Sequence, residues 1–342
     1  MITVSVIIPV FNGGLTLREC LDSVLRQTIE GMEVICIDNG STDSSKAIIQ
    51  QYAAQDPRLQ LLEQENLGGP AWARNRGIQA AQGEYLAFMD ADDLYPSPQT
   101  LQTLYQTAKE QGVNICGGSF GEFRATIKDT GKPKRIITHW DDPHAAGYTF
   151  AAPGLINYAD YQFDFGWTRF IYNRAFLLEH HITQPQFRYF EDPPFLVQAL
   201  SAAQRFYAIP QITYLYRWTP GKLHRLSTPQ TALDALAAVE HNIRFAHSHG
   251  YQTLFDISVH RLCKILELIT TNDLGVVARQ LKILSLLQSL PNAAAQAQRL
   301  SQQLQWQFID EKNMLNALRL TRLSLFLKRL KRFIKRHLGM PQ

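Results

Sequence analysis

Short apolar runs alternate with amphipathic segments over the first ninety residues of the chain. The runs at 4–10, 33–38, 59–62 and 85–89 are rich in β-branched and aromatic residues, which is typical of buried strands. The segments between them space their apolar residues as helices do. This alternation predicts an α/β fold, a mostly parallel sheet flanked by helices on both faces. Ligands of such sheets bind beyond the carboxyl ends of the strands.

Polar residues stand at the carboxyl ends of three of these runs. Phe11 and Asn12 follow the first, Asp38 ends the second, and the acidic run 90–93 follows the last. Two carboxylates in an Asp-x-Asp pattern suit a hard divalent cation, which prefers oxygen ligands. Aspartate is also common in solvated turns, so the acidic run alone does not define a metal site. Its convergence with the other strand ends predicts a binding site at this edge of the sheet.

Several other classes of protein are disfavoured. The chain has neither a GxxxxGK[ST] phosphate loop nor a GxGxxG turn after its first strand. Its four cysteines include no C-x-x-C pair, which favours reduced thiols over a zinc site. The net charge of +4 gives no indication of nucleic-acid binding. The N-terminus has the pattern of a strand and not of a signal peptide, and no apolar run reaches the roughly 18 residues of a spanning helix.

The chain carries four motifs in order, which are Pro9-Val10-Phe11-Asn12, the segment Asp38 to Asp43, the segment Asn66 to Gly77 and the segment Gly83 to Asp93. In their order and spacing they resemble the motifs of the inverting family 2 glycosyltransferases with the A-type fold, of the type that builds bacterial envelope polysaccharides. The resemblance is strongest over about the first 115 residues. Many members carry a glutamate where this chain has Gly13 and Gly14, a departure that bears on contacts at that turn and not on the fold.

The resemblance implies a nucleotide-sugar donor, with UDP the usual carrier in the family. Asp38 would hydrogen-bond the base or ribose, Arg74 would lie in or near the donor pocket, and Asp90 would contact the ribose. Asp92 would bind Mn²⁺ or Mg²⁺ bridging the diphosphate, while Asp93 would anchor the turn. The donor-binding residues expected on this basis are Pro9, Phe11, Asn12, Asp38, Arg74, Asp90 and Ala91.

An inverting transfer also needs a general base for the acceptor hydroxyl. The family carries a Glu-Asp pair at a helix start, which here is Glu191-Asp192. We assign Asp192 as the base and Glu191 as an alternative base or a positioning partner. Asp192 before Pro193 and Pro194 also suits helix capping. Both functions are compatible, because a helix N-terminus favours an ionised carboxylate.

Further site residues are expected from the second half of this region. Trp167 either stacks on an acceptor sugar or packs in the core, since aromatic side chains do both. A strand at 213–217 precedes a loop that is mobile in the family and closes over the diphosphate. In that loop Lys222 and Arg225 would face phosphate and His224 would complete the metal shell; a surface position is the alternative for His224.

The chain is helical in pattern from residue 229 onward. A basic amphipathic helix is expected at about 314–338, of the kind that lies on an anionic membrane surface. The alternatives are packing on this protein or on a partner subunit, which leaves a homo-oligomer open. A membrane-bound tail suggests a cytoplasmic enzyme attached peripherally to the inner face of the plasma membrane. Its acceptor would then be a glycan or lipid-linked glycan of lipopolysaccharide or capsule.

These expectations combine into a domain plan. Residues 1–228 would form the catalytic domain, with nucleotide-sugar binding at 1–115 and the acceptor and catalytic part at 116–228. Residues 229–342 would form a helical extension. The function predicted is inverting, metal-dependent glycosyl transfer. The alternatives are an inactive glycan-binding or scaffold protein and a sugar-nucleotide pyrophosphorylase, whose Gly-rich signature is missing after the first strand.

Overall fold

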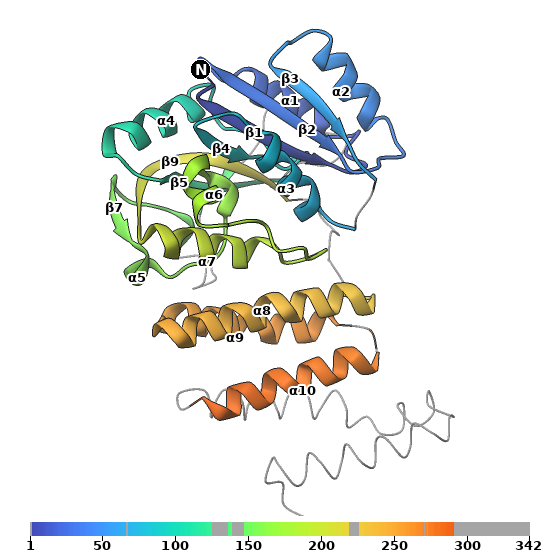
Figure 1. The fold of residues 1–342 in the computed structure, drawn as a ribbon, viewed down its shortest axis with the longest axis vertical. Helices are drawn as coiled ribbons and strands as arrows, with labels where there is room; N and C mark the ends of the chain where they lie inside the picture. Colours follow the sequence, from blue (N-terminus) through green and yellow to red (C-terminus); the bar gives the residue numbers. More distant parts are fainter. Residues whose placement is uncertain are drawn as a thin grey trace, which may run out of the picture. The chain divides into compact units, whose positions relative to one another are not determined.

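The computed structural model has a mixed α/β sheet with helices on both faces, which confirms the predicted fold class (Figure 1). The chain divides into two compact units, Met1–Val277 and Ala278–Gln342. The residues that the structure describes are 2–65, 68–124, 136–138, 147–218, 226–269, 271 and 273–290.

Nine strands form the sheet in the described part of the chain. They are β1 (Val4–Val10), β2 (Met32–Asp38), β3 (Leu59–Glu63), β4 (Tyr85–Phe88), β5 (Ile115–Arg124), β6 (Ile136–Ile137), β7 (Gly154–Asn157), β8 (Phe170–Asn173) and β9 (Arg205–Trp218). Their order is β3-β2-β1-β4-β8-β5-β9-β7, with β6 paired to β5 alone. The helices are α1 (Leu17–Leu25), α2 (Ser45–Ala53), α3 (Pro70–Ala80), α4 (Thr100–Gln111), α5 (Tyr158–Tyr161), α6 (Arg174–Glu179), α7 (Asp192–Ala203), α8 (Pro229–His249), α9 (Gln252–Leu268) and α10 (Leu274–Ser289).

The four strands β3, β2, β1 and β4 are parallel, as the sequence predicts. Val10 at the end of β1 lies opposite Asp38 at the end of β2, and Asp38 lies opposite Glu63 of β3. The carboxyl ends of these strands therefore meet at one edge of the sheet. This edge is where the polar strand ends of the sequence are brought together.

Both faces of the parallel half are buried. Val6 and Ile8 of β1 belong to one core cluster with residues of α1, α2 and α4. Ile7, which points to the opposite face, belongs to a second cluster with residues of α3 and α7. This alternation follows from the two-residue period of a strand. It explains why β1 is apolar at consecutive positions and not only at every second one.

The second half of the sheet is mixed. Strand β8 runs antiparallel to both β4 and β5, β9 runs parallel to β5, and β7 pairs antiparallel with β9. The strand expected at 213–217 is longer and spans Arg205–Trp218. Its pairing with β5 shifts register next to Ser119, and this irregularity accommodates Pro210, which has no backbone N–H.

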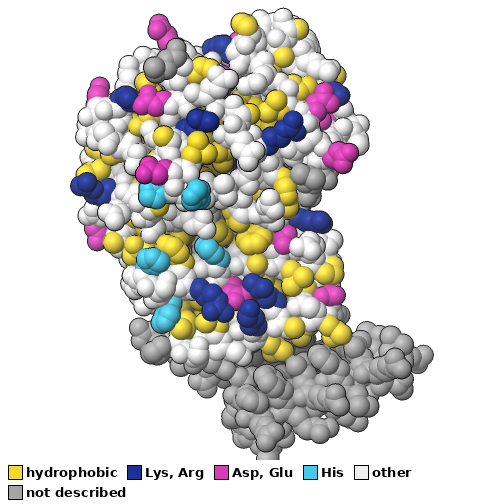
Figure 2. Space-filling view, viewed as in Figure 1, with side chains coloured by type: hydrophobic (Ala, Val, Ile, Leu, Met, Phe, Trp, Pro, Cys, Tyr) yellow, Lys and Arg dark blue, Asp and Glu magenta, His cyan; other side chains and the backbone are white. Residues whose placement is uncertain are grey.

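Helices α8 and α9 lie in the same compact unit as the sheet, so the boundary predicted at residue 228 falls inside that unit. Helix α8 contacts α7 directly. Among the described residues, no helix is both long and apolar enough to cross a membrane. The amphipathic segment 314–338 lies outside the described residues. On the face shown in Figure 2, acidic and basic side chains are interspersed, in keeping with the net charge of +4.

Candidate active site

The acidic turn after β4 is fixed by its last carboxylate. Asp93 is buried, and it accepts hydrogen bonds from the Tyr214 hydroxyl at 2.6 Å and the Arg217 backbone N–H at 2.7 Å. Burial raises the pKa of Asp93, and the charges of Asp92 and Asp90 raise it further. The expectation that Asp93 anchors the turn is confirmed. The side chains of Asp90 and Asp92 are half-buried.

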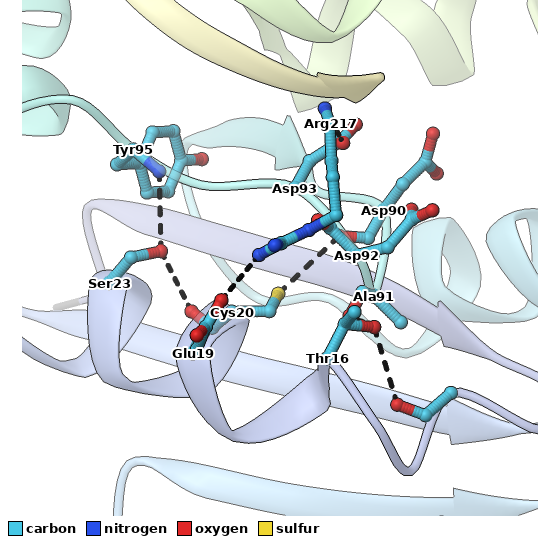
Figure 3. A network of polar contacts seen from close by, with 11 residues as sticks. Thr16, Glu19, Cys20, Ser23, Asp90, Ala91, Asp92, Asp93, Tyr95 and Arg217 are labelled. Atoms are coloured by element: carbon cyan, nitrogen blue, oxygen red, sulfur yellow. Dashed lines mark hydrogen bonds and ion pairs between the residues drawn. The ribbon is translucent and has the colours of Figure 1, made fainter. Parts of the chain in front are cut away.

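Arg217 clamps the same turn from the end of β9 (Figure 3). Its Nε donates to the Asp92 carbonyl at 2.6 Å and its Nη2 pairs with Glu19 of α1 at 2.5 Å. Its guanidinium lies over the Phe123 ring at 4.7 Å. Sequence analysis gave this residue no function, although a basic residue at the end of an apolar strand is a usable signal. Arg217 therefore sets the backbone position of the predicted metal ligand.

Arg74 of α3 connects two segments that are far apart in the sequence. It donates to Asp90 Oδ1 at 2.7 Å and to Glu191 Oε1 at 2.5 Å. Its guanidinium also lies over the Trp167 ring at 4.7 Å. Arg74 and Glu191 are both buried, so the pair is poorly screened by water. This Arg74 bridge holds the start of α7 against the acidic turn.

Asp192 is the first helical residue of α7, and Glu191 occupies the N-cap position without a side-chain capping bond. The capping interpretation of Asp192 is therefore wrong. Burial and the charge of Glu191 raise the pKa of Asp192 to about 7, although Arg74 and Arg261 lower it. The helix N-terminus thus does not keep this carboxylate fully ionised at neutral pH, contrary to the expectation. A carboxyl group with a pKa near 7 is well suited to act as a general base at neutral pH.

The backbone before Asp192 is strained. Phe190 has φ of 64°, a left-handed conformation that aromatic residues rarely adopt. Such a conformation costs about 1–3 kcal/mol and persists where the surroundings hold it. Here the Arg188 N–H donates to Asp234 Oδ2 of α8 at 2.9 Å. Helix α8 thereby supports the segment that carries the Glu-Asp pair.

Trp167 is a core residue, and the prediction that it stacks on an acceptor sugar is not supported. Its side chain is buried, with ring centroids 4.8 Å from Phe88 and 5.4 Å from Phe195. Its indole ring also lies 4.7 Å from the Arg74 guanidinium. The indole supports the Arg74 bridge and leaves no face for a ligand.

Asp38 offers a buried acceptor at the edge of the sheet. Its Oδ2 accepts a weak bond from the Ser41 N–H at 3.3 Å, and its Oδ1 is buried with no hydrogen-bond partner among the described residues. An unsatisfied buried carboxylate oxygen is costly unless a ligand donates to it. Phe11, which follows the neighbouring strand β1, is 52% exposed. Phe11 is thus accessible from solvent, whereas Asp38 offers a buried acceptor that no described residue satisfies.

The remaining expected donor residues shape the turn after β1. Asn12 has φ of 51°, and its Oδ1 accepts from the Thr42 N–H at 2.8 Å, so its side chain fastens this turn to the next loop. Pro9 is half-buried in β1 opposite Ile37. The Ala91 carbonyl accepts a bond from Thr16 at 3.2 Å.

The two glycines that depart from the family pattern have a local explanation. The Gly13 N–H donates to Ser45 Oγ and the Gly14 N–H to Asp43 Oδ2, each at 2.9 Å. A Cβ at Gly14 would lie 2.5 Å from Ser44 Oγ. The backbone approaches the next loop so closely that a side chain at Gly14 would require a shift.

The residues present are compatible with a divalent ion held mainly by a donor diphosphate. The described residues contain no group of three or more His, Cys, Asp or Glu that could hold a metal by themselves. Asp92 is half-buried at the acidic turn, and Mg²⁺ and its relatives are often bound by one or two carboxylates plus substrate phosphates. The predicted ligand His224 and the predicted phosphate-facing Lys222 and Arg225 lie outside the described residues.

A parallel half joined to a mixed half, with an acidic turn after β4, matches the A-type fold of glycosyltransferases. The chain belongs to glycosyl transferase family 2, whose family model matches residues 5–182. It is 29% identical over 252 residues to the uncharacterized glycosyltransferase EpsJ of Bacillus subtilis strain 168, covering 72% of this chain and 70% of EpsJ. It is 30% identical over 253 residues to the putative glycosyltransferase EpsH of the same strain, again covering 72% and 70%.

The fold also matches a solved structure. Residues 1–349 of S. aureus TarS, crystallised with UDP-GlcNAc, align with a TM-score of 0.62 and 19% identity, covering 85% of this chain and 82% of that one. The similarity supports the fold, including its sheet and the helices that flank it.

Proposed function

We propose that the chain transfers a sugar from a UDP-sugar, with inversion, to a hydroxyl of a glycan or lipid-linked glycan. The observation that carries this proposal is the Arg74 bridge. It joins the acidic turn, where a donor diphosphate would lie, to the start of α7, where Asp192 lies. A direct displacement requires a donor site and a base that are held close together, and this bridge joins the two segments that would supply them.

The donor would use the edge of the parallel half. The unpartnered Asp38 Oδ1 would accept a hydrogen bond from the base or ribose, and the exposed Phe11 ring would pack beside the base. UDP as the carrier is supported by the UDP-GlcNAc complex of TarS. Asp92 would hold a divalent ion, Mn²⁺ or Mg²⁺, which would act as a Lewis acid on the diphosphate leaving group.

The reaction would be a single displacement. Asp192 would remove the proton of the acceptor hydroxyl while the hydroxyl oxygen attacks the anomeric carbon. The bond from that carbon to the diphosphate oxygen would break, and the diphosphate would leave with the electron pair. Glu191 would position the segment through Arg74 and would not act as the base, because its Oε1 is engaged by the guanidinium.

The test is release of UDP from a panel of UDP-sugars, with and without Mn²⁺. We expect turnover by the natural chain, its loss in Asp192→Asn, and normal turnover in Glu110→Gln, an exposed carboxylate of α4. The anomeric configuration of the product, measured by NMR, should be opposite to that of the donor. Retention of configuration would refute the mechanism, and glycan binding without turnover would favour a binding protein.

We also propose peripheral attachment to the inner face of the plasma membrane and a place in envelope polysaccharide synthesis. The attachment rests on the basic amphipathic pattern at 314–338. The polysaccharide assignment rests on the motif resemblance.

A further inference from the structure

Four aromatic side chains pack around Phe120 of β5, and we call these five residues the aromatic cluster. Phe120 lies between the rings of Tyr214 and Tyr216, each 6.0 Å away and stacked. Tyr148 and Phe165 close its remaining side at 5.5 and 6.3 Å, and they stack on each other at 5.4 Å. Such a cluster forms a rigid platform, because each ring is held by at least one other.

The aromatic cluster is hydrogen-bonded to the acidic turn and is close in sequence to Trp167, which contacts the Arg74 bridge. The Tyr214 hydroxyl donates to Asp93 and accepts from the Asp90 N–H, which ties the cluster to the acidic turn. At its other side, Phe165 stands two residues before Trp167, whose indole contacts Arg74. The platform is thus bonded to the donor side and linked through the chain to the segment that positions the base.

Only part of the aromatic cluster is buried. Phe120 and Tyr214 are almost fully covered, whereas Tyr148, Phe165 and Tyr216 are half-buried. In an ordinary hydrophobic core all five rings would be buried, whereas here three of them are partly exposed. Partly exposed aromatic rings beside polar groups are suited to ligands that have both apolar and hydroxyl faces.

We propose that Tyr148, Phe165 and Tyr216 bind a pyranose ring of a saccharide acceptor. This inference rests on the proposed function and names the substrate class of its second subsite. A sugar ring stacks its C–H face on aromatic rings and turns its hydroxyls toward polar neighbours. An acyl or isoprenoid chain fits less well, because it would remove water from the carboxylates of the acidic turn without replacing its hydrogen bonds.

The backbone beneath Phe165 is unusually well fixed. The preceding residue, Asp164, is buried and accepts bonds from Arg261 Nη2 of α9 at 2.8 Å and from Asn242 Nδ2 of α8 at 2.9 Å. The following residue, Gly166, has φ of 73°, which few other residues adopt without strain. Pre-organisation of this kind reduces the ordering cost of binding a weak ligand.

The experiment uses the full chain with UDP and Mg²⁺. Saturation-transfer NMR would measure binding of three probes, the methyl β-glycosides of glucose, galactose and N-acetylglucosamine. We expect affinity for at least one of them to fall about fivefold in Phe165→Leu and in Tyr216→Leu, the equivalent of about 1 kcal/mol for each lost aromatic face. Tyr216→Phe, which keeps the ring, should retain most of the affinity. The matched control is Tyr105→Leu, a half-buried tyrosine of α4 that should bind as the natural chain does.

The outcomes separate this inference from the proposed function. The inference would be overturned if saccharide binding were unchanged in both leucine variants. It would also be overturned if none of the three glycosides bound to the natural chain. Binding of farnesyl phosphate, a lipid probe, that depends on the same two rings while the glycosides do not bind would overturn it as well. UDP affinity, measured separately by calorimetry, should be equal in all variants. Absence of UDP binding by the natural chain would instead refute the donor half of the proposed function.

Discussion

Removal of the Arg74 guanidinium tests how the two halves of the site are joined. The side chain of Arg74 is 5% exposed, that of Glu191 is 8% exposed and that of Asp90 is 33% exposed. Arg74→Met keeps a long apolar stem and deletes the charge. Two carboxylates then lose their partner in very different surroundings. Water can reach Asp90, whereas Glu191 stays enclosed.

The magnitude follows from this difference in exposure. Removing one partner of a buried ion pair costs about 3–5 kcal/mol, because the other charge stays buried and unpaired. A partner as exposed as Asp90 contributes less than about 1 kcal/mol. We therefore expect Arg74→Met to lower the free energy of unfolding by about 3–5 kcal/mol, nearly all of it from Glu191.

A double variant makes the asymmetry measurable. Adding Glu191→Leu to Arg74→Met removes the stranded charge and should recover about 2 kcal/mol or more. Adding Asp90→Asn instead should recover less than about 1 kcal/mol. Urea unfolding followed by circular dichroism, with equal m-values across the series, gives the free energies.

The control for this series is an exposed ion pair. Lys46 and Glu63 pair at 2.6 Å with side chains 44% and 52% exposed, so Lys46→Met should change the free energy of unfolding far less than Arg74→Met does. If Asp90→Asn rescued Arg74→Met as well as Glu191→Leu does, the buried Glu191 pair would not be the reason for the loss. A loss below about 1 kcal/mol in Arg74→Met would also refute the reasoning.

Four further predictions concern activity and location. The rate of transfer should rise as pH increases through about 7, because Asp192 acts as a base only when it is deprotonated. Arg261→Gln should move the midpoint of this rise to higher pH, because the charge of Arg261 lowers the pKa of Asp192. A midpoint near pH 4 would contradict the assignment. Asp38→Ala should weaken UDP binding about tenfold in calorimetry, while unchanged affinity would show that its buried oxygen meets no ligand. Asp92→Ala should abolish transfer and the gain in donor affinity on adding Mn²⁺, with the circular dichroism spectrum unchanged; near-normal turnover would show that Asp92 is not essential. Deleting 314–342 should release the protein from sedimenting vesicles that contain anionic lipid, and unchanged partition would rule out lipid contact by this segment.

Much of the first half of the fold could be predicted because its signals are local. Strand β1 is a continuous β-branched run, and β2 and the acidic turn carry motifs within a few residues. The anchoring function of Asp93 also follows from its place at a strand end. The structure agrees with each of these features.

The parts that could not be predicted depend on distant pairing. Arg74 and Glu191 are separated by 117 positions, and they meet because the antiparallel pairing of β8 with β4 joins the two halves of the sheet. The burial of Trp167 follows from the same placement, since its ring meets Phe88 of β4 and Phe195 of α7. These contacts cannot be inferred from the spacing of residues in the sequence.

The β4–β8 boundary has a consequence for recombination between family members. A chimera that takes its N-terminal part from one enzyme and the remainder from another would cut the chain between Arg74 and Glu191. Each parent could be well folded, and the hybrid would still fail if its two parts supply mismatched charges to this buried contact. Exchanging acceptor specificity by grafting should therefore succeed only when Asp90, Arg74 and Glu191 are kept as a set. The choice of crossover point is therefore constrained by a salt bridge and not by the boundary of a domain.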